Sequence, residues 1–205
     1  MTEQAKVAVV YHSATGSVHA LARAAADAAA KEGAEVRLVK TRELALAEAV
    51  NSNEAWAAHA ARTEDVPEAS MDDLDWADVI LIGSPTRFGL PAAQVKQFID
   101  LAGPLWSQGK LVDKVASSFT SAGTAHGGQE TTITAINNTF HHWGAIIVTP
   151  GYADPIQFQA GNPYGASHVS NNGQTPPGET ELASVSFQAR RAVGIAAALK
   201  RGRAE

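Results

Sequence analysis

The sequence predicts an α/β fold with a doubly wound parallel sheet, and two observations carry that prediction. Short apolar runs recur along the chain, and a helical stretch separates most of them from the next. The runs at residues 7–10, 79–83 and 145–148 are almost continuously apolar, which is typical of strands buried on both faces. Strands that alternate with helices form right-handed crossovers, and these crossovers place helices on both faces of a parallel sheet.

Five such strands are expected to pair in the order 2-1-3-4-5, the flavodoxin-like version of a doubly wound sheet. Ligands of these sheets bind at the carboxyl ends of strands one, three and four. We therefore expect one flavodoxin-like domain over residues 1–205, with its site in the loops after these strands. The expected strands are residues 7–10, 35–39, 79–83, 115–119 and 145–148, and the expected helices are residues 18–32, 94–101, 130–142 and 182–200.

Two segments are longer than a minimal five-strand domain needs. Residues 44–75 are rich in Ala, Asn and Glu, and we expect a helical excursion that contacts another subunit. Residues 151–178 carry Gly- and Pro-rich stretches and are too long for a structureless loop, unless the loop is functional or lies against a neighbouring chain. Both segments therefore predict oligomer contacts.

Composition narrows the classes of function. The 16 Lys and Arg residues against 21 Asp and Glu give a net charge of −5 without a basic stripe, which argues against nucleic-acid binding. The sequence has no cysteine, which excludes disulfides, thiolate metal sites and a cysteine nucleophile, and no histidine spacing indicates a metal site. No apolar run approaches the ~18 residues of a membrane span, and residues 1–6 do not resemble a signal peptide. We expect a cytoplasmic protein with no membrane insertion.

Residues 11–18, Tyr-His-Ser-Ala-Thr-Gly-Ser-Val, connect the first expected strand to an alanine-rich helix. A hydroxyl-rich turn that opens a helix suits a phosphate group, because the first helical turn has free N–H groups and the helix dipole favours an anion. Gly16 lets the backbone approach such a ligand. The Walker-A and dinucleotide-binding glycine patterns are both absent, so the loop suits a single terminal phosphate such as that of FMN. The alternative is a plain helix cap made by Thr15 or Ser17.

Two further loops follow the third and fourth expected strands. Residues 82–91, Ile-Gly-Ser-Pro-Thr-Arg-Phe-Gly-Leu-Pro, predict an irregular loop whose backbone can bond the polar edge of a flat ring. Phe88 would cover that ring, and Arg87 would stack on it or contact an anionic substrate. Residues 120–130 are mostly small and would let a planar ligand lie close to the backbone. The ordinary alternatives are a strand–helix connection with Arg87 in solvent, and helix capping by residues 129–130.

The three loops together resemble those of the WrbA family of flavodoxin-like NAD(P)H:quinone oxidoreductases. The matching stretches are Pro-Thr-Arg-Phe-Gly at 85–89, Gly-Gly-Gln-Glu-Thr at 127–131 and Gly-Asn-Pro-Tyr-Gly-Ala at 161–166. The resemblance implies FMN as the cofactor, NADH or NADPH as the co-substrate and a quinone as the electron acceptor. It implies an FMN site made of Ser13, Ala14, Thr15, Gly16, Ser17, Val18, Pro85, Thr86, Arg87, Phe88, Gly89, Ser121, Ala122, Gly123, Thr124, Gly127 and His142.

The same resemblance implies substrate contacts. Trp106 matches the tryptophan that lines the substrate pocket of the family, and Phe88 and Arg87 are expected beside it. His142, next to His141, is the expected counterpart of the family histidine near the flavin. It is the catalytic candidate, through hydrogen bonding or proton delivery to the quinone oxygen. The family assembles as tetramers with sites completed by neighbouring chains, so a homodimer or homotetramer is implied.

The implied reaction is a two-electron reduction of quinones, in which hydride passes from NAD(P)H to flavin N5 and then to the quinone. Two alternatives come from other classes of protein: a flavodoxin-type one-electron carrier, and a flavin-binding scaffold or regulatory protein. The mild net charge and the two extra segments argue against the carrier.

Overall fold

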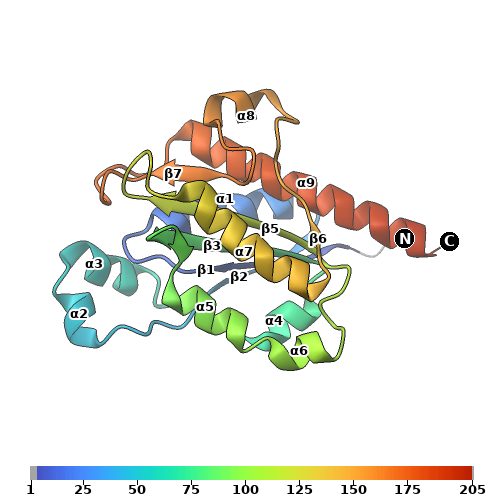
Figure 1. Cartoon of the computed structure of the whole chain (residues 1–205), viewed down its shortest axis with the longest axis horizontal. Helices are drawn as coiled ribbons and strands as arrows, with labels where there is room; N and C mark the ends of the chain where they lie inside the picture. The colour runs from blue at the N-terminus through green and yellow to red at the C-terminus, as the bar shows by residue number, and fades with distance from the viewer. Residues whose placement is uncertain (1–3, 205) are drawn as a thin grey trace.

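The computed structural model describes residues 4–204, and its sheet has the predicted core order (Figure 1). Five strands pair in parallel in the order β2-β1-β3-β5-β6. Two short strands are additions to this core: β4 pairs antiparallel with β3, and β7 pairs parallel with β5. β5 and β6 are thus the fourth and fifth expected strands, and the core has the expected order 2-1-3-4-5. The predicted domain limits, residues 1 and 205, lie outside the described residues. The strands are β1 Lys6–Tyr11, β2 Glu35–Lys40, β3 Val79–Arg87, β4 Leu90–Pro91, β5 Val115–Ala122, β6 Ile146–Ile147 and β7 Ser167–Val169.

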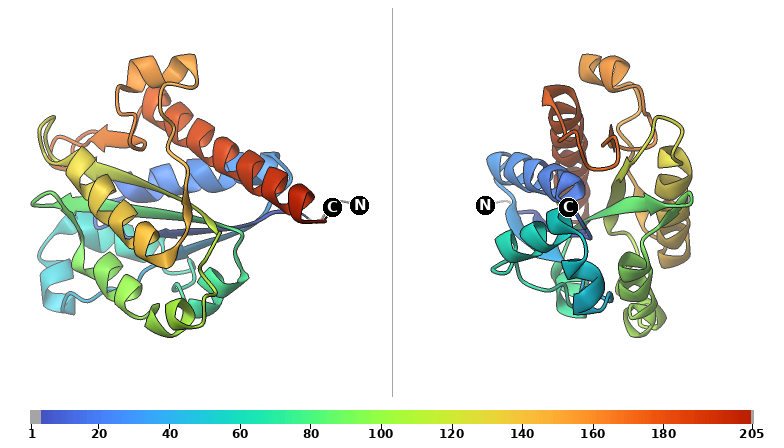
Figure 2. Two further views of the ribbon diagram at one scale, coloured as in Figure 1. Left: turned by 45° about the vertical axis from the view of Figure 1, so that its right-hand side comes forward. Right: turned by 90° about the vertical axis from the view of Figure 1, so that its left-hand side faces the viewer.

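Helices cover both faces of the sheet: α1 and α9 pack on one face, and α4, α5 and α7 pack on the other (Figure 2). The four expected helices are confirmed, with ends shifted by one to four residues. Across residues 4–204, none of the helices combines the length and the apolar character that a membrane span requires. The helices are α1 Ser17–Lys31, α2 Ala47–Asn51, α3 Glu54–Arg62, α4 Met71–Trp76, α5 Ala93–Asp100, α6 Gly103–Ser107, α7 Gln129–Trp143, α8 Pro155–Ala160 and α9 Glu179–Ala204.

The central strands are apolar at successive positions because both of their faces are buried. In β1, Val7 and Val9 belong to the core beneath α1 and α9, whereas Ala8 and Val10 belong to the core beneath α4, α5 and α7. Side chains alternate across a strand, so a run without polar residues supplies both cores at once. The prediction of two-sided burial is confirmed for β1 and β3, whereas residues 145–147 of the third predicted run are only half-buried.

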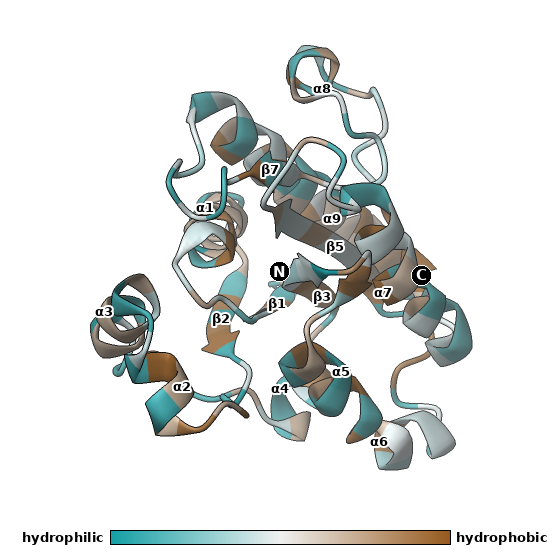
Figure 3. Ribbon diagram, turned by 60° about the vertical axis from the view of Figure 1, so that its left-hand side comes forward, coloured by the Kyte–Doolittle hydropathy of each residue, from teal (hydrophilic) through white to brown (hydrophobic). Residues whose placement is uncertain are grey.

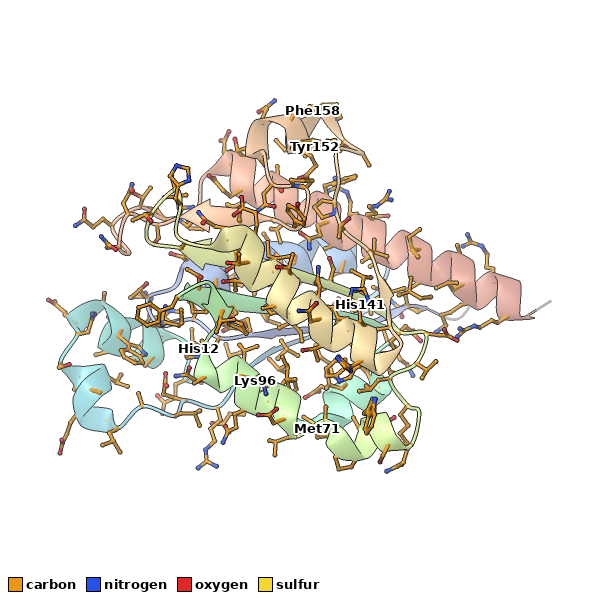
Figure 4. The ribbon with its side chains drawn as sticks, in the orientation of Figure 1. His12, Met71, Lys96, His141, Tyr152 and Phe158 are labelled. Carbon is orange, nitrogen blue, oxygen red and sulfur yellow. The ribbon has the colours of Figure 1, made fainter. Side chains whose placement is uncertain are left out.

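The predicted fifth strand, residues 145–148, is shorter and discontinuous. Only β6, at Ile146–Ile147, pairs with the start of β5, while β7 pairs with the carboxyl half of β5. Much of the 151–178 segment, including α8, therefore interrupts the edge strand, and the chain then returns to it. Tyr152 and Phe158 lie together on this insertion with ring centroids 5.0 Å apart, and both are exposed (Figure 4).

The excursion over residues 44–75 is helical as expected, but its last part belongs to the core. Leu74 of α4 is fully buried against the sheet, so α4 is the helix of the crossover from β2 to β3. The Asp73 carboxylate accepts hydrogen bonds from the backbone N–H and the hydroxyl of Ser70, both at 2.8 Å, which completes a capping box at the start of α4. The extra part of the excursion is thus α2 and α3.

Candidate functional site

A cavity of about 270 Å³ opens at the carboxyl edge of the sheet, between the loops that follow β1, β3 and β5. The three loops singled out in the sequence therefore meet at one place, as the strand order requires. A fourth segment, after β7, completes the wall. The lining residues are Ser13, Ala14, Thr15, Ser17, Val18, Pro85, Thr86, Arg87, Ser121, Ala122, Gly123, Ser170, Asn172 and Gly173.

The first loop presents hydroxyl groups and the free N–H groups of a helix start. Gly16 precedes α1 with φ 110°, a left-handed conformation that favours glycine, and no side chain caps the helix. The expected alternative of a plain cap by Thr15 or Ser17 is therefore wrong. The Ser13 hydroxyl accepts a hydrogen bond of 3.1 Å from the Gly16 N–H, which shapes the turn. In the described part of the chain the Thr15 and Ser17 hydroxyls have no hydrogen-bond partner, so they are available to a ligand.

The second loop is a hairpin, which corrects the expectation of an irregular loop. β3 runs on to Arg87, and the chain turns through Phe88 and Gly89 into β4. Phe88 has φ 55° and Gly89 has φ 77°, the two left-handed residues of a tight hairpin turn. A non-glycine residue in this conformation costs about 1 kcal/mol. The turn holds the Phe88 side chain fully exposed, with 103% relative accessibility, at the rim of the cavity.

The hairpin is tied to the start of α7 by a hydroxyl and by two glycines. The Thr86 hydroxyl lies 2.6 Å from the Thr132 hydroxyl and 3.3 Å from the carbonyl oxygens of Gly127 and Gly128. A Cβ on Gly128, which has φ 91°, would lie 2.7 Å from the Cα of Gly89. The loops after β3 and β5 therefore form one joined wall of the cavity.

The third loop is bonded to a segment that sequence reasoning missed. The Ser170 N–H donates to the Ala122 carbonyl at 2.8 Å, and the Asn172 N–H donates to the Gly123 carbonyl at 3.3 Å. Residues 171–173 are all left-handed, with φ values of 47°, 57° and 87°. The signal in the sequence was Asn-Asn-Gly, because these residue types tolerate the left-handed region.

Five predicted cofactor residues belong to the same loops but do not line the cavity. They are Gly16, Phe88, Gly89, Thr124 and Gly127. Gly16 and Gly89 shape turns with positive φ, and a Cβ on Gly127 would lie 2.7 Å from the Ala122 side chain. The three glycines therefore shape the loops around the cavity, whereas Phe88 is exposed beside it.

Trp106 and His142 lie at the other end of the sheet. α7 has 15 residues and is about 22 Å long, and His142 is in its last turn, whereas the cavity is near its first turn. The Trp106 indole N–H donates to the His142 carbonyl at 2.8 Å, and the Asp113 N–H donates to the Gly144 carbonyl just before β5 begins. Figure 4 shows the neighbouring His141 on the carboxyl-terminal half of α7. Within one chain, the structure does not bring these residues to the cavity.

His12, in the first loop, is buried and interacts electrostatically with the half-buried carboxylate of Glu43. Burial lowers the pKa of His12 to about 4; the Glu43 carboxylate opposes this shift, and Arg87 adds to it. Burial raises the pKa of Glu43, but hydrogen bonds from the Ala45 N–H and the Gln94 amide, together with His12, lower it overall. At neutral pH the histidine is therefore neutral and the carboxylate charged.

The donor set of the cavity fits FMN. Hydroxyls and helix-start N–H groups suit a phosphate monoester, and the lining contains no lysine. Small residues at the end of β5 and just after it, Ser121, Ala122 and Gly123, line the cavity without bulky side chains. A Cβ on Gly123 would lie 2.6 Å from the Asn172 side-chain oxygen, so glycine at this position lets the segment after β7 pack against the third loop. The fold and this cavity define a flavodoxin-like protein with a site for a flavin mononucleotide.

Comparison with known proteins identifies the family. Residues 5–158 match the model of the family described as NADPH-dependent FMN reductase, and the chain belongs to this family. The NAD(P)H dehydrogenase (quinone) of Deinococcus radiodurans is 48% identical over 97% of this chain and 99% of its own length. That of Sinorhizobium fredii is 40% identical over 95% and 98%. The flavodoxin, WrbA-like protein of Agrobacterium tumefaciens superposes with a TM-score of 0.62 over 94% and 98% at 23% identity, which shows the same fold.

Proposed function

We propose that the protein is an FMN-dependent NAD(P)H:quinone oxidoreductase. The observation that carries the proposal is the cavity in which a phosphate-type loop meets the walls after β3 and β5. Relatives that share nearly the whole chain and are named NAD(P)H dehydrogenase (quinone) support the same reaction.

In this proposal each wall has a separate task. The hydroxyls and N–H groups of residues 13–18 bind the FMN phosphate, and residues 85–87 and 121–123 hold the two sides of the ring. When bound, FMN supplies the two-electron chemistry, accepting hydride from NAD(P)H and passing it to a quinone. Phe88, exposed at the rim, covers apolar ligand surface, and the exposed Arg87 contacts anionic groups of a substrate.

A second copy of the chain completes the site in this account. Trp106 is 55% exposed and is fixed by its hydrogen bond to the His142 carbonyl, so the two residues form one surface unit remote from their own cavity. A homodimer or homotetramer would bring this unit to the cavity of a neighbour. Exposed aromatic residues on the insertion around α8 offer further contact surface. The single domain over residues 1–205 and the cytoplasmic location stay predictions.

Steady-state kinetics of the FMN-loaded protein test the proposal. We expect NADH or NADPH oxidation that depends on benzoquinone, with a 1:1 ratio of co-substrate to quinone consumed. A stable semiquinone on reductive titration, with little turnover, would indicate the flavodoxin-type carrier instead. Flavin binding with neither property would indicate a scaffold.

A further inference from the structure

A groove of about 490 Å³ lies between α1 and α3, on the other side of the first loop from the FMN cavity. His19, Arg23 and Asp27 line it at intervals of four residues along α1, and His59 and Arg62 line it from α3. Figure 3 shows α1 and α3 on the same flank of the molecule. The groove therefore exists only because of the excursion after β2.

The groove gathers basic side chains that form no hydrogen bond or ion pair within the described residues. Arg23 and Arg62 are exposed, and over the described residues neither forms an ion pair or a hydrogen bond. The His19 and His59 rings contact each other at 5.2 Å between centroids and likewise form no hydrogen bond in residues 4–204. Among the lining residues the one carboxylate is Asp27. The groove is therefore electropositive, and the start of α1 adds to its positive potential.

The positive potential contributes to the lowered pKa values of the two histidines. Burial lowers the pKa of His59 to about 4, and His19, Arg62, Lys40 and His12 lower it further. Burial also lowers the pKa of His19, together with Arg23, Arg62 and Lys40. An anion in the groove would oppose these cations, raise both histidine pKa values and draw protons onto the protein.

The bases of the groove differ from the donors of the FMN cavity. Two guanidinium groups on facing helices suit a phosphoryl group, because each guanidinium can bind phosphate oxygens through two parallel hydrogen bonds. The FMN cavity instead offers hydroxyls and N–H groups. Since Gly16 lines the groove and its neighbours line the cavity, a ligand that crosses the first loop can reach both.

We propose that the groove between α1 and α3 is a second anion site, which binds a phosphoryl group of the nicotinamide dinucleotide co-substrate. The identity of the ligand rests on the proposed function, whereas anion binding by the groove does not. Arg23 and Arg62 bind the phosphoryl group, and the site depends on α3 because this helix places Arg62 opposite Arg23 of α1.

Calorimetric titration of the FMN-loaded protein with inorganic pyrophosphate tests the anion site without any turnover. We expect saturable binding that takes up protons at pH 6, measured in two buffers with different ionisation enthalpies. The R23Q/R62Q double variant should bind pyrophosphate at least roughly tenfold more weakly, because each lost contact to a charged group is of that size. The control is R191Q, which removes an exposed arginine of α9 outside the groove. No binding, or equal binding by the double variant, would overturn the proposal.

Kinetics with NADPH and NADH identify the phosphoryl group. If it is the 2′-phosphate, the double variant raises KM for NADPH roughly tenfold or more and leaves KM for NADH unchanged. If it is the pyrophosphate, KM rises for both. Pyrophosphate binding with both KM values unchanged would overturn the assignment to the co-substrate and leave a free-phosphate site. Protein that binds pyrophosphate but oxidises neither dinucleotide would contradict the proposed function and leave the anion site standing.

Discussion

The hydroxyl oxygens of Thr86 and Thr132 lie 2.6 Å apart and join the end of β3 to the first turn of α7. The contact sits behind the cavity, so it positions the wall that we assign to the flavin ring. Thr86→Val removes the hydroxyl and leaves the buried Thr132 hydroxyl without this partner, at a cost of about 1–3 kcal/mol. We expect a lower free energy of unfolding in urea and weaker FMN binding by fluorescence. The matched control, Thr134→Val on the exposed side of α7, should change the free energy of unfolding by about 0.5 kcal/mol or less.

Gly128 makes a second close contact between the hairpin after β3 and the start of α7. In Gly128→Ala the new Cβ would meet the Cα of Gly89 at 2.7 Å, in a backbone conformation that side chains rarely adopt. Because backbone must move to relieve the clash, we expect a loss of stability on the order of 2 kcal/mol or more, together with reduced FMN affinity. Gly109→Ala separates the two causes, since Gly109 also has a positive φ but has open space around it. Equal effects of the two substitutions would show that close packing at Gly128 is unimportant.

His59 makes the stability of the protein depend on pH. Its folded-state pKa of about 4 lies below the ordinary value of 6.5, so the unfolded chain binds more protons between these values. The contribution of His59 to stability is therefore complete above about pH 6.5 and decreases as the pH falls towards 4, by on the order of 3 kcal/mol at most. Urea unfolding at pH 4.5, 5.5 and 7 should show a shallower dependence in His59→Gln than in the wild type. Parallel dependences would contradict the depressed pKa.

Trp106 and His142 should act across a subunit boundary. Trp106→Ala is expected to keep the fold and the FMN content, because the side chain is half exposed and remote from its own cavity, and to lower quinone turnover. A Gly128→Ala chain, impaired in its own cavity, still carries an intact Trp106. Mixed oligomers of the two variants, formed by refolding together, should recover part of the activity that each lacks. A monomer in sedimentation at micromolar concentration, or no recovery in the mixture, would contradict this arrangement.

The sequence was sufficient for the parts of the fold that depend on apolar patterning. The apolar runs in β1 and β3 and the alanine-rich face of α1 could be recognised from the sequence, because burial on both faces leaves the start of each strand without polar residues. The place of α4 in the core could not be predicted, because six residues with one fully buried apolar side chain, Leu74, give little periodicity. The split of the edge strand into β6 and β7 was missed because each piece has at most three residues and pairs only through the distant β5.

Some parts of the candidate site could likewise be predicted from the sequence, and others could not. The residues that follow β1, β3 and β5 could be predicted because strand order alone brings those loops together. The hairpin at Phe88 could not, since a phenylalanine in the left-handed region breaks the usual preference. The wall made by residues 170–173 depends on where the insertion returns to the sheet. Trp106 and His142 could be placed on helices, but the cavity they serve depends on an assembly that one chain does not specify.

The central claim is that the loops after β1, β3 and β5 form an FMN site, and titration of the apoprotein with FMN tests it most directly. We predict saturation at one FMN per chain, quenching of flavin fluorescence, and much weaker binding in a Ser13→Ala/Thr15→Ala/Ser17→Ala variant that keeps its circular dichroism spectrum. Absence of saturable binding, or equal affinity in that variant, would contradict the account.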